Sequence, residues 1–329
     1  MILVITHDRD AHGRHMVDLL RTRGKEVKIL DCSKFPTAAT LTFELTDSPR
    51  TSLRLADGTR VDAQSIESIL NRRQPEPMAP QTISDARIQE YIVRESRNFL
   101  DALPQLIPAF WLNHPDRNRV ASRKPYQLLL AKTLGFSVPP TTITNDPEAV
   151  RLFVNSIPGD IAIKTLWTPG ISVSDKGGAE RHFTLYTAKQ SREQALVGIA
   201  KVQNCPMIFQ SYVEKAFELR ITVVESRVFS CAIHSQQSEK ARHDWRNYDL
   251  ANTPHKSYQL PTAVEERCIR LVKELDLSFG CIDMIVTPSG EYVFLEINPN
   301  GQWLWIEHLT GMPISDAIAD LLVHPPRAT

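Results

Sequence analysis

Two carboxylates and one carboxamide lie close together in the sequence, within residues 281–298. Asp283 belongs to an apolar run, CIDMIV, while Glu296 and Asn298 belong to a second run, EYVFLEIN. The intervening TPSG is a strong turn signal, so the two runs predict a β-hairpin. A hairpin centred on that turn places Asp283 opposite Phe294, and the alternation of side chains puts the three polar groups on one face. Three oxygen donors at that spacing suit Mg²⁺ bound together with phosphates.

The opposite face of this hairpin is the one expected to be buried. It carries six apolar side chains, with Ile282, Met284 and Val286 set against Val293, Leu295 and Ile297. On the polar face, two carboxylates without a cation would repel each other, and one pKa would rise. A solvated hairpin face with scattered acids explains the same pattern, because acids on exposed strands are common. A register slip of one residue would also separate the acids. Both interpretations stay open on the pattern alone.

A lysine inside an apolar strand is the second feature that could do chemistry. Lys164 lies in IAIKTLW, residues 161–167, where it either extends to the strand edge or meets an anion. The next loop carries glycines and serines whose backbone N–H groups could cover phosphates, although an ordinary surface loop explains it too. These residues are Gly170, Ser172, Ser174, Gly177 and Gly178. The sequence contains no GxxxxGKS/T motif, so a P-loop is excluded.

The elements that must position these groups begin with a β-α-β unit. Residues 1–6 are apolar and β-branched, residues 14–23 carry apolar side chains on one helical face, and Gly24 can end that helix. Residues 27–30 predict the next strand, so a parallel sheet is expected. The first turn lacks the GxGxxG pattern, which argues against a dinucleotide site there.

The rest of the chain predicts two further units. Residues 71–87 hold three prolines and predict a long loop, and a helix at 88–103 precedes the end of the first domain. Ser122 is the expected N-cap of the next helix, which Gly135 ends. The other expected elements are strands at 161–167, 181–187 and 207–213, a strand pair within 219–234, and helices at 190–202 and 263–276. The predicted fold class is α/β (α+β), with domains at residues 1–118, 119–205 and 206–329.

The composition excludes several classes of protein. The 329 residues include 38 Lys+Arg and 38 Asp+Glu, so the net charge of zero gives no strong attraction to nucleic acid or to anionic membranes. No apolar run approaches the ~18 residues of a membrane span, and the N-terminus does not resemble a signal peptide. The five cysteines include no CxxC pair and are expected to be reduced thiols of a cytoplasmic protein, without a zinc site.

The order of these features resembles the ATP-grasp superfamily over most of residues 119–310. DMIVTPSGEYVFLEINPN is similar to the superfamily's metal signature, one Asp followed by Glu-x-Asn. The resemblance implies an N-terminal parallel-sheet pre-ATP-grasp domain followed by two α+β subdomains that clamp ATP. The residues that it implies are Asp283, Glu296 and Asn298 as ligands of two Mg²⁺ ions, and Lys124 and Lys164 as contacts of the ATP phosphates.

A stretch in the middle of the chain, MIFQSYVEKAFELR, resembles the adenine-binding hinge of the same superfamily. The resemblance implies that backbone groups of Tyr212 and Val213 read the adenine edge and that Gln210 lies in the same nucleotide pocket. It further implies that Glu218 holds the ribose hydroxyls.

Four other stretches narrow the resemblance to graspetide synthetases of the microviridin and plesiocin type. They are DCSKFP, NRRQPEP, HSQQSEKARHDWRNYDL and LEINPNGQWLWIEHLTG. In such enzymes ATP phosphorylates an Asp or Glu side chain of a ribosomal precursor peptide. This step releases ADP. A Thr, Ser or Lys side chain of that peptide then attacks the acyl phosphate, and an ω-ester or ω-amide ring forms as phosphate leaves. The resemblance also implies a homodimer and a surface near residues 170–187 that binds the leader segment of the peptide.

Arg220 and Arg246 are the candidates for binding the transferred phosphoryl group and the tetrahedral oxyanion, since the planar guanidinium binds phosphate bidentately. An ion pair with Glu218 is the alternative role of Arg220, and simple solvation is the alternative for Arg246. His243 and Asp244 could accept the proton of the nucleophile.

Trp303 and Trp305 could line the acceptor pocket, although a tryptophan after a strand more often packs in the core. Two other functions remain open at this point. One is an ATP-grasp ligase that adds amino acids to a protein or small molecule, and the other is a non-catalytic ATP-binding protein.

Overall fold

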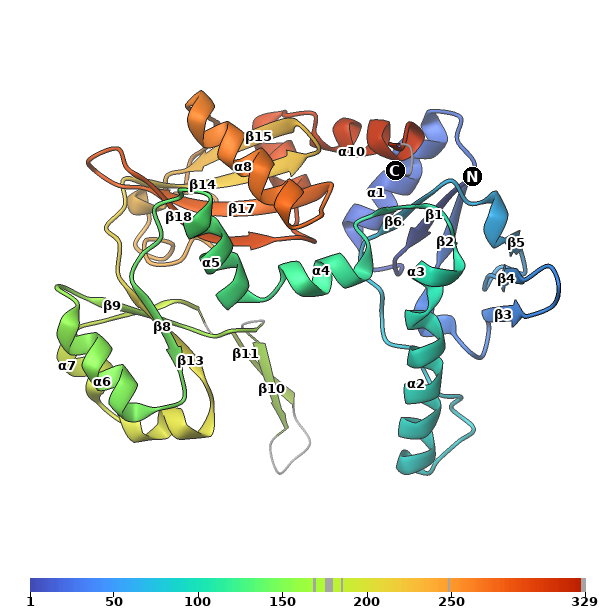
Figure 1. Ribbon diagram of the computed structural model, residues 1–329, viewed down its shortest axis with the longest axis horizontal. Coiled ribbons are helices and arrows are strands. Elements are labelled where there is room, and N and C mark those ends of the chain that lie inside the picture. The colour runs from blue at the N-terminus through green and yellow to red at the C-terminus, as the bar shows by residue number, and fades with distance from the viewer. Residues whose placement is uncertain (168–169, 175–179, 185, 248, 327–329) are drawn as a thin grey trace.

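The computed structural model describes the chain except residues 168–169, 175–179, 185, 248 and 327–329, and it leaves the side chains of residues 168–185 undescribed. The chain forms three lobes (Figure 1). The first lobe contains the N-terminus. Helices α4 (Pro115–Ala121) and α5 (Lys124–Thr133) connect it to two lobes that lie one above the other in this view.

A parallel sheet forms the centre of the first lobe, with strand order β2-β1-β6-β7. Its strands are β1 (Ile2–Ile5), β2 (Val27–Leu30), β6 (Ser68–Asn71) and β7 (Phe110–Leu112). Helix α1 (Ala11–Thr22) starts where the Asp10 carboxylate accepts a hydrogen bond from the His12 N–H, and Gly24 follows its end with a φ of +72°. The predicted β-α-β unit is therefore confirmed.

A three-stranded antiparallel sheet and two helices complete the first lobe. They are β3 (Thr40–Glu44), β4 (Arg50–Arg54), β5 (Arg60–Asp62), α2 (Ala86–Asp101) and α3 (Leu103–Leu106). The long segment between β6 and α2 has no regular structure before residue 86, as its three prolines predict.

The middle lobe is an antiparallel sheet with the order β12-β9-β13-β8. Its elements are β8 (Thr141–Thr144), α6 (Pro147–Ser156), β9 (Ile161–Lys164), β12 (Ala188–Gln190), α7 (Arg192–Leu196) and β13 (Met207–Ser211). Apolar residues of α6 and α7 pack on one face of the sheet, with Val150, Val154 and Phe209 in the same buried cluster. The hairpin β10 (Gly170–Ser174) and β11 (Glu180–Thr184) extends from this lobe (Figure 1).

The third lobe is a five-stranded antiparallel sheet with the order β16-β15-β14-β17-β18. Its strands are β14 (Phe217–Val224), β15 (Arg227–Ile233), β16 (His255–Ser257), β17 (Phe279–Val286) and β18 (Tyr292–Asn298). Helix α8 (Thr262–Glu274), which lies where a helix is predicted at 263–276, covers one face through Val264, Cys268, Leu271 and Val272.

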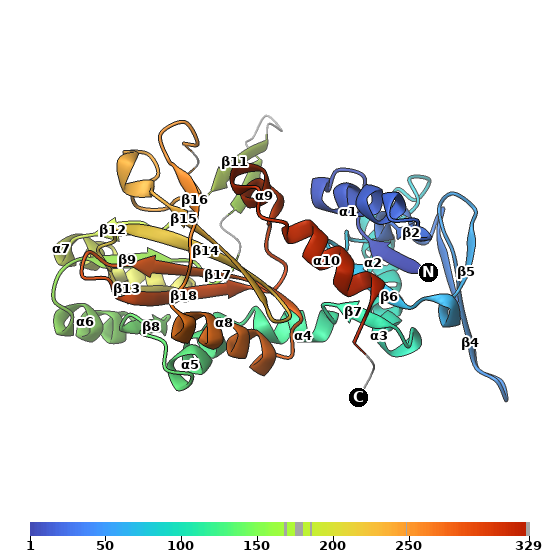
Figure 2. The ribbon, with the colours of Figure 1, turned by 90° about the horizontal axis from the view of Figure 1, so that it is seen from above.

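Two C-terminal helices tie the third lobe to the first. They are α9 (Leu304–Thr310) and α10 (Ile314–Val323), and Figure 2 shows α10 lying between α1 and the third sheet. One continuous apolar core includes Leu20 of α1, Ile233 of β15 and Ile318 of α10. The Arg23 guanidinium also binds the Asp320 carboxylate at 2.7 Å. The two lobes therefore share a buried interface.

Three details differ from the sequence predictions. Ser122 caps the end of α4 rather than the start of the next helix, because its hydroxyl donates to the Asn118 carbonyl one turn earlier. The helix expected at 190–202 is interrupted at Gly198, whose φ of +72° precedes a separate 3₁₀ turn. Residues 170–174 of the expected loop form the strand β10, and the glycines at 177 and 178 lie outside the described residues.

The register of the β17–β18 hairpin also differs from the symmetric one. Asp283 pairs with Glu296, whereas Met284 pairs with Phe294, so β18 carries one extra residue at Leu295. As a result Phe294, rather than Leu295, faces the buried cluster with Met284. The bulge sets the two carboxylates directly opposite each other on the same face. Among the described residues, no helix is long and apolar enough to cross a membrane.

Candidate active site

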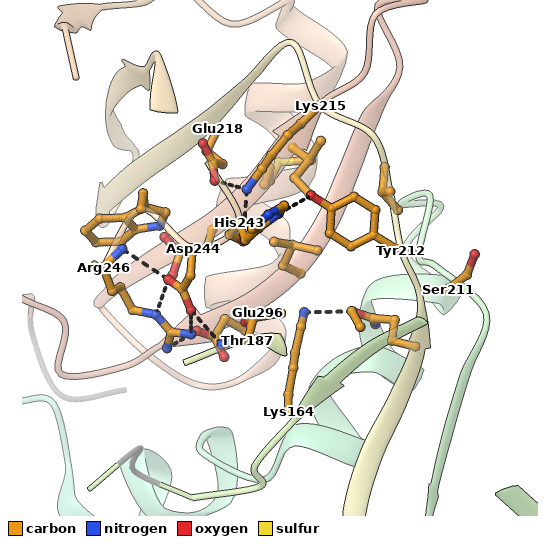
Figure 3. A pocket seen from close by; sticks show the side chains of 18 residues that line it. Lys164, Thr187, Ser211, Tyr212, Lys215, Glu218, His243, Asp244, Arg246 and Glu296 are labelled. Carbon is orange, nitrogen blue, oxygen red and sulfur yellow. Dashed lines mark hydrogen bonds and ion pairs between the residues drawn. The ribbon is translucent and has the colours of Figure 1, made fainter. Parts of the chain in front are cut away.

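A cavity opens between the middle and third lobes, where β9 and β13 face the hairpin of β17 and β18 (Figure 3). Its floor includes Asp283, Glu296 and the apolar Leu295 that the bulge turns toward it. Lys164 and Gln210 line the cavity from the middle lobe. Acidic and basic groups that are far apart in the sequence therefore meet in one cleft between two sheets.

Asp283 is buried and bound by an arginine from the neighbouring strand. The Arg220 Nη1 lies 3.0 Å from each carboxylate oxygen of Asp283, its register partner across β14 and β17. Burial raises the pKa of Asp283, against the lowering effect of Arg220. The expected alternative, an ion pair between Arg220 and Glu218, is wrong because Glu218 binds the Lys215 ammonium and the Ser235 hydroxyl instead.

Glu296 is held among three cations. The Lys124 ammonium, at the first residue of α5, contacts its carboxylate directly, and the Arg246 Nη1 lies 3.9 Å from it. Burial raises the pKa of Glu296, but Lys124, Arg246 and Lys164 outweigh burial and lower that pKa to about 2. Glu296 therefore stays ionised at neutral pH although Asp283 faces it.

The third predicted oxygen donor, Asn298, is exposed and lies outside the cavity lining. It follows Glu296 on the same face of β18, and its Oδ1 accepts the Asn300 N–H at 3.0 Å. The donor set nevertheless fits Mg²⁺. Two carboxylates lie opposite each other, and the carboxamide lies at the next position of that face. Mg²⁺ prefers such hard oxygen ligands, and its remaining positions are filled by phosphates and water.

Lys164 and Gln210 form a bonded pair on the other wall of the cavity. The Lys164 Nζ donates to the Gln210 Oε1 at 2.8 Å, and the Gln210 Nε2 donates to the Thr141 hydroxyl at 2.8 Å. The three strands β9, β13 and β8 thus fix the direction of the lysine. Burial lowers the pKa of Lys164 to about 8. The prediction that this lysine meets an anion stays open, and the structure aims it into the cleft (Figure 3).

The predicted adenine hinge lies at the end of β13. The Tyr212 N–H donates to the Asp160 carbonyl at 2.9 Å, so its carbonyl oxygen is the backbone group left for a ligand. The Tyr212 hydroxyl lies 3.3 Å from the His243 Nδ1, and the Lys189 ammonium lies 4.1 Å from the centre of its ring. Val213 and Glu218 line the same cavity, and burial raises the pKa of Glu218.

Arg246 is oriented by a bidentate bond to Asp244. Its Nε and Nη2 donate to the two carboxylate oxygens of Asp244 at 2.8 and 2.6 Å. The same carboxylate accepts from the backbone N–H groups of Arg246 and Thr187, each at 3.1 Å. Burial raises the pKa of Asp244, but Arg246 outweighs it and lowers the pKa to about 2. Asp244 is therefore a poor proton acceptor, contrary to one of the two expectations. Burial lowers the pKa of His243, which leaves a neutral imidazole.

The tryptophans separate into two roles. Trp303 is a core residue that donates to the Ser315 hydroxyl at 3.0 Å, so it does not line an acceptor pocket. Trp305 stacks on Trp245 with a ring distance of 5.0 Å. Trp245 lines the cavity and its ring lies 5.8 Å from the Arg220 guanidinium.

Trp245 and Lys215 are site residues that the sequence analysis did not single out. Trp245 stands beside Arg246 in the HDWR stretch, and its type and neighbours were the available signal. Lys215 follows the hinge by two residues, and only its buried contact with Glu218 reveals it. The side chains of 170–185, in the expected leader-binding surface, lie outside the described residues.

Comparison with known proteins agrees with this geometry. Residues 1–119 match the family model of the MvdD pre-ATP grasp domain, and residues 121–322 match that of the RimK-like ATP-grasp domain. The chain therefore belongs to the ATP-grasp family, in its RimK-like branch. No match is found among curated proteins.

Solved structures place it more narrowly. A RiPP-associated ATP-grasp ligase of Chryseobacterium gregarium, in complex with ADP and a leader and core peptide, is 30% identical. The match covers 99% of this chain and 97% of that one, with a TM-score of 0.89. The macrocyclase MdnC of Microcystis aeruginosa MRC, bound with precursor peptide MdnA, is 29% identical over 98% and 99%, with a TM-score of 0.85. The chain groups with the ATP-grasp ligases associated with ribosomally made, modified peptides.

The fold extends to more distant enzymes. The ATP-grasp ligase PsnB, complexed with minimal precursor, Mg and ADP, is 22% identical over 98% of this chain and 96% of that one, with a TM-score of 0.76. At that identity the likeness concerns the fold alone.

Proposed function

We propose that this protein is an ATP-dependent peptide macrocyclase. It joins Asp or Glu side chains of a ribosomal precursor peptide to Thr, Ser or Lys side chains of the same peptide. The observation that carries the proposal is the single cleft in which Asp283 and Glu296 face Arg246 and Lys164. Arg220 reaches this cleft through its two bonds to Asp283. The precursor peptides bound to MdnC and to the Chryseobacterium ligase support a peptide as the acceptor.

Asp283, Glu296 and Asn298 would hold Mg²⁺, two ions in this proposal. When bound, the ions neutralise the triphosphate and stabilise the charge of the transferred phosphoryl group. Lys164 would bind the phosphates from the middle lobe, and Lys124 would bind them from the start of α5, beside Glu296. Before nucleotide binds, Lys124 neutralises Glu296, so this lysine is already placed at the edge of the metal site.

The arginines perform the acyl-transfer part of the reaction. A peptide carboxylate attacking ATP brings anions together, so fixed cations must lie there before the reaction. Arg246 is preoriented by Asp244 and presents its remaining N–H groups to the acyl phosphate. Arg220 stays charged because Asp283 supports it. His243 lines the same cleft, with its Nδ1 3.3 Å from the Tyr212 hydroxyl, and it is the candidate to accept a proton from the attacking hydroxyl or from the lysine ammonium before its amine attacks.

The nucleotide base would lie at the hinge. The Tyr212 carbonyl accepts from the adenine amino group and the Val213 N–H donates to the ring, while Gln210 keeps Lys164 in place. Glu218 accepts from the ribose, after exchange of its Ser235 bond.

The remaining proposals concern organisation and partners. Domains at 1–118, 119–205 and 206–329 would act as the pre-ATP-grasp, central and C-terminal units. The protein would be a cytoplasmic homodimer, with the peptide as its partner rather than nucleic acid or membrane.

Incubation with a precursor peptide, ATP and Mg²⁺ tests the function directly. We expect the peptide to lose the mass of one water for each ring formed, with one ADP released per ring, as high-resolution mass spectrometry and nucleotide chromatography measure. AMP as the product, or a gain in mass by addition of an amino acid, would contradict macrocyclisation. A small gene beside this one that encodes a peptide with repeated cores rich in Thr and Glu would favour macrocyclisation over the addition of free amino acids.

Lys164 predicts how nucleotide binding depends on pH. Its pKa is lowered to about 8, so the ammonium that attracts phosphate is present below that pH and is lost above it. At pH 9 roughly a tenth of the free protein keeps the charge, and the affinity for ADP falls by up to about tenfold relative to pH 7. Calorimetric titrations across this range measure the change.

The control is Lys164→Arg, which stays charged throughout and should flatten the profile. An equally steep decline in that variant would assign the pH dependence to another group.

A further inference from the structure

The backbone that follows Asn298, the last predicted metal ligand, is hydrogen-bonded to the first lobe. This segment, residues 299–302, is called here the Pro-Asn-Gly-Gln loop. Arg72, at the end of β6, donates from its Nη1 to both the backbone oxygen of Asn300, at 2.7 Å, and its side-chain oxygen. The Asn300 Nδ2 in turn donates to the Arg72 carbonyl. Three hydrogen bonds therefore join one arginine to one residue of the loop.

A second residue of the first lobe holds the same loop. The Asn113 Nδ2 donates to the Pro299 carbonyl at 2.9 Å and to the Phe279 carbonyl at 2.8 Å, while its Oδ1 accepts from the Phe279 N–H at 3.0 Å. Asn113 thus fixes the loop relative to the start of β17, the strand that carries Asp283.

Arg72 itself is fixed from several sides. Its side chain is 1% exposed, its backbone N–H donates to the Ile5 carbonyl at 3.1 Å, and its guanidinium lies 5.1 Å from the Trp303 ring. The Asp10 carboxylate lies 3.6 Å from its Nε. Within the described residues, the Nε and Nη2 of Arg72 have no hydrogen-bond partner. Burying a charge with unused donors costs stability, so stability alone does not account for an arginine here.

The other side of the loop contacts the candidate active site. The Asn298 Oδ1 accepts from the Asn300 N–H, and the Gln302 carbonyl accepts from the Arg220 Nη2 at 3.3 Å. A Cβ added to Gly301 would lie 2.8 Å from that same Nη2, which shows how closely the backbone approaches Arg220. A displacement of Asn300 would therefore move the oxygen of Asn298 and the support of Arg220 together.

We propose that Arg72 is a positioning residue for the reaction. By holding Asn300, it fixes the position of the Asn298 side-chain oxygen and of the Gln302 carbonyl that binds Arg220. The first lobe thereby completes a metal site whose ligands all belong to the third lobe. The inference rests on the proposed function of the cleft, because it assigns Asn298 to Mg²⁺. Partners that orient metal ligands typically change metal affinity by about 10- to 100-fold when they are replaced.

Calorimetric binding of ADP at increasing Mg²⁺ concentration tests this role without requiring turnover. Arg72→Lys keeps the positive charge but loses the planar guanidinium with its several N–H donors. In this variant the Mg²⁺ concentration that gives half of the maximal increase in ADP affinity should rise about 10- to 100-fold. ADP affinity without Mg²⁺ should stay within about twofold, since Arg72 does not line the nucleotide cleft. The matched control is Arg73→Lys, at the exposed neighbouring arginine, which should behave as the wild type.

A second variant guards against loss of folding. Asn300→Ala removes the same link from the loop side and should shift the Mg²⁺ dependence similarly, and the double variant should be no worse than either single one. An unchanged Mg²⁺ dependence in folded Arg72→Lys and Asn300→Ala would overturn the inference alone and leave Arg72 structural. If the ADP affinity of the wild type did not depend on Mg²⁺ concentration, the proposed metal site itself would be overturned.

Discussion

Replacing Glu296 by glutamine should remove nearly all Mg²⁺-dependent turnover while leaving the protein folded. Glutamine keeps the shape of the side chain but removes the charge that the metal ion needs. The loss of several kcal/mol of charge stabilisation lowers kcat by about 10²- to 10³-fold. Stability without nucleotide should change little, because the variant loses the Lys124 ion pair but also relieves the repulsion from Asp283. Ring formation by mass spectrometry and thermal unfolding measure the two effects.

Glu291→Gln is the matched control for this experiment. Glu291 is an exposed carboxylate just before β18, where it accepts a hydrogen bond from the Ser137 hydroxyl, and it does not line the cleft. This variant should keep wild-type turnover. Unfolding of Glu296→Gln at ordinary temperature would show that Glu296 is structural, and full turnover at low Mg²⁺ would show that it is not a metal ligand.

The local elements of the fold could be predicted because their signals are local. The β-branched residues of β1, the glycine that follows α1 and the helical segment of α8 each depend on neighbours within a few residues. The β17–β18 hairpin follows from its turn in the same way. The bulge at Leu295 could not be predicted, since it depends on which side chains of β18 pack in the buried cluster with those of α5 and α8. Asp283 and Glu296 share a face in both the symmetric and the observed register. The prediction that they lie on one face is therefore correct although the predicted register is not.

The partners of the charged residues could not be predicted because they depend on strand order. Glu218 and Arg220 are two residues apart on β14, so the sequence makes them candidates for one ion pair. The pairing of β14 with β17 brings Asp283 directly opposite Arg220, so Arg220 binds Asp283 rather than Glu218. The links from Arg72 to Asn300 and from Lys124 to Glu296 join residues that are farther apart still.

Replacing Arg220 by methionine should cost much of the protein's stability. The side chain is 6% exposed and its partner Asp283 is 10% exposed, so the variant leaves a buried carboxylate without its cation. Breaking a buried pair from one side costs about 3–5 kcal/mol, a large share of the roughly 5–15 kcal/mol that holds a domain folded. Thermal unfolding without nucleotide should show a clear decrease in Tm, and turnover should be lost.

The double variant Arg220→Met and Asp283→Leu separates the structural role of the pair from its chemical role. Replacing both charges by apolar side chains of similar size is often neutral or stabilising, so Tm should recover most of the loss. Turnover should stay absent, because both a metal ligand and a phosphate-binding cation are missing. A double variant as unstable as the single one would place the stabilising contact of Arg220 at Gln302 or Trp245 instead. A stable double variant that still closed rings would remove both residues from the mechanism.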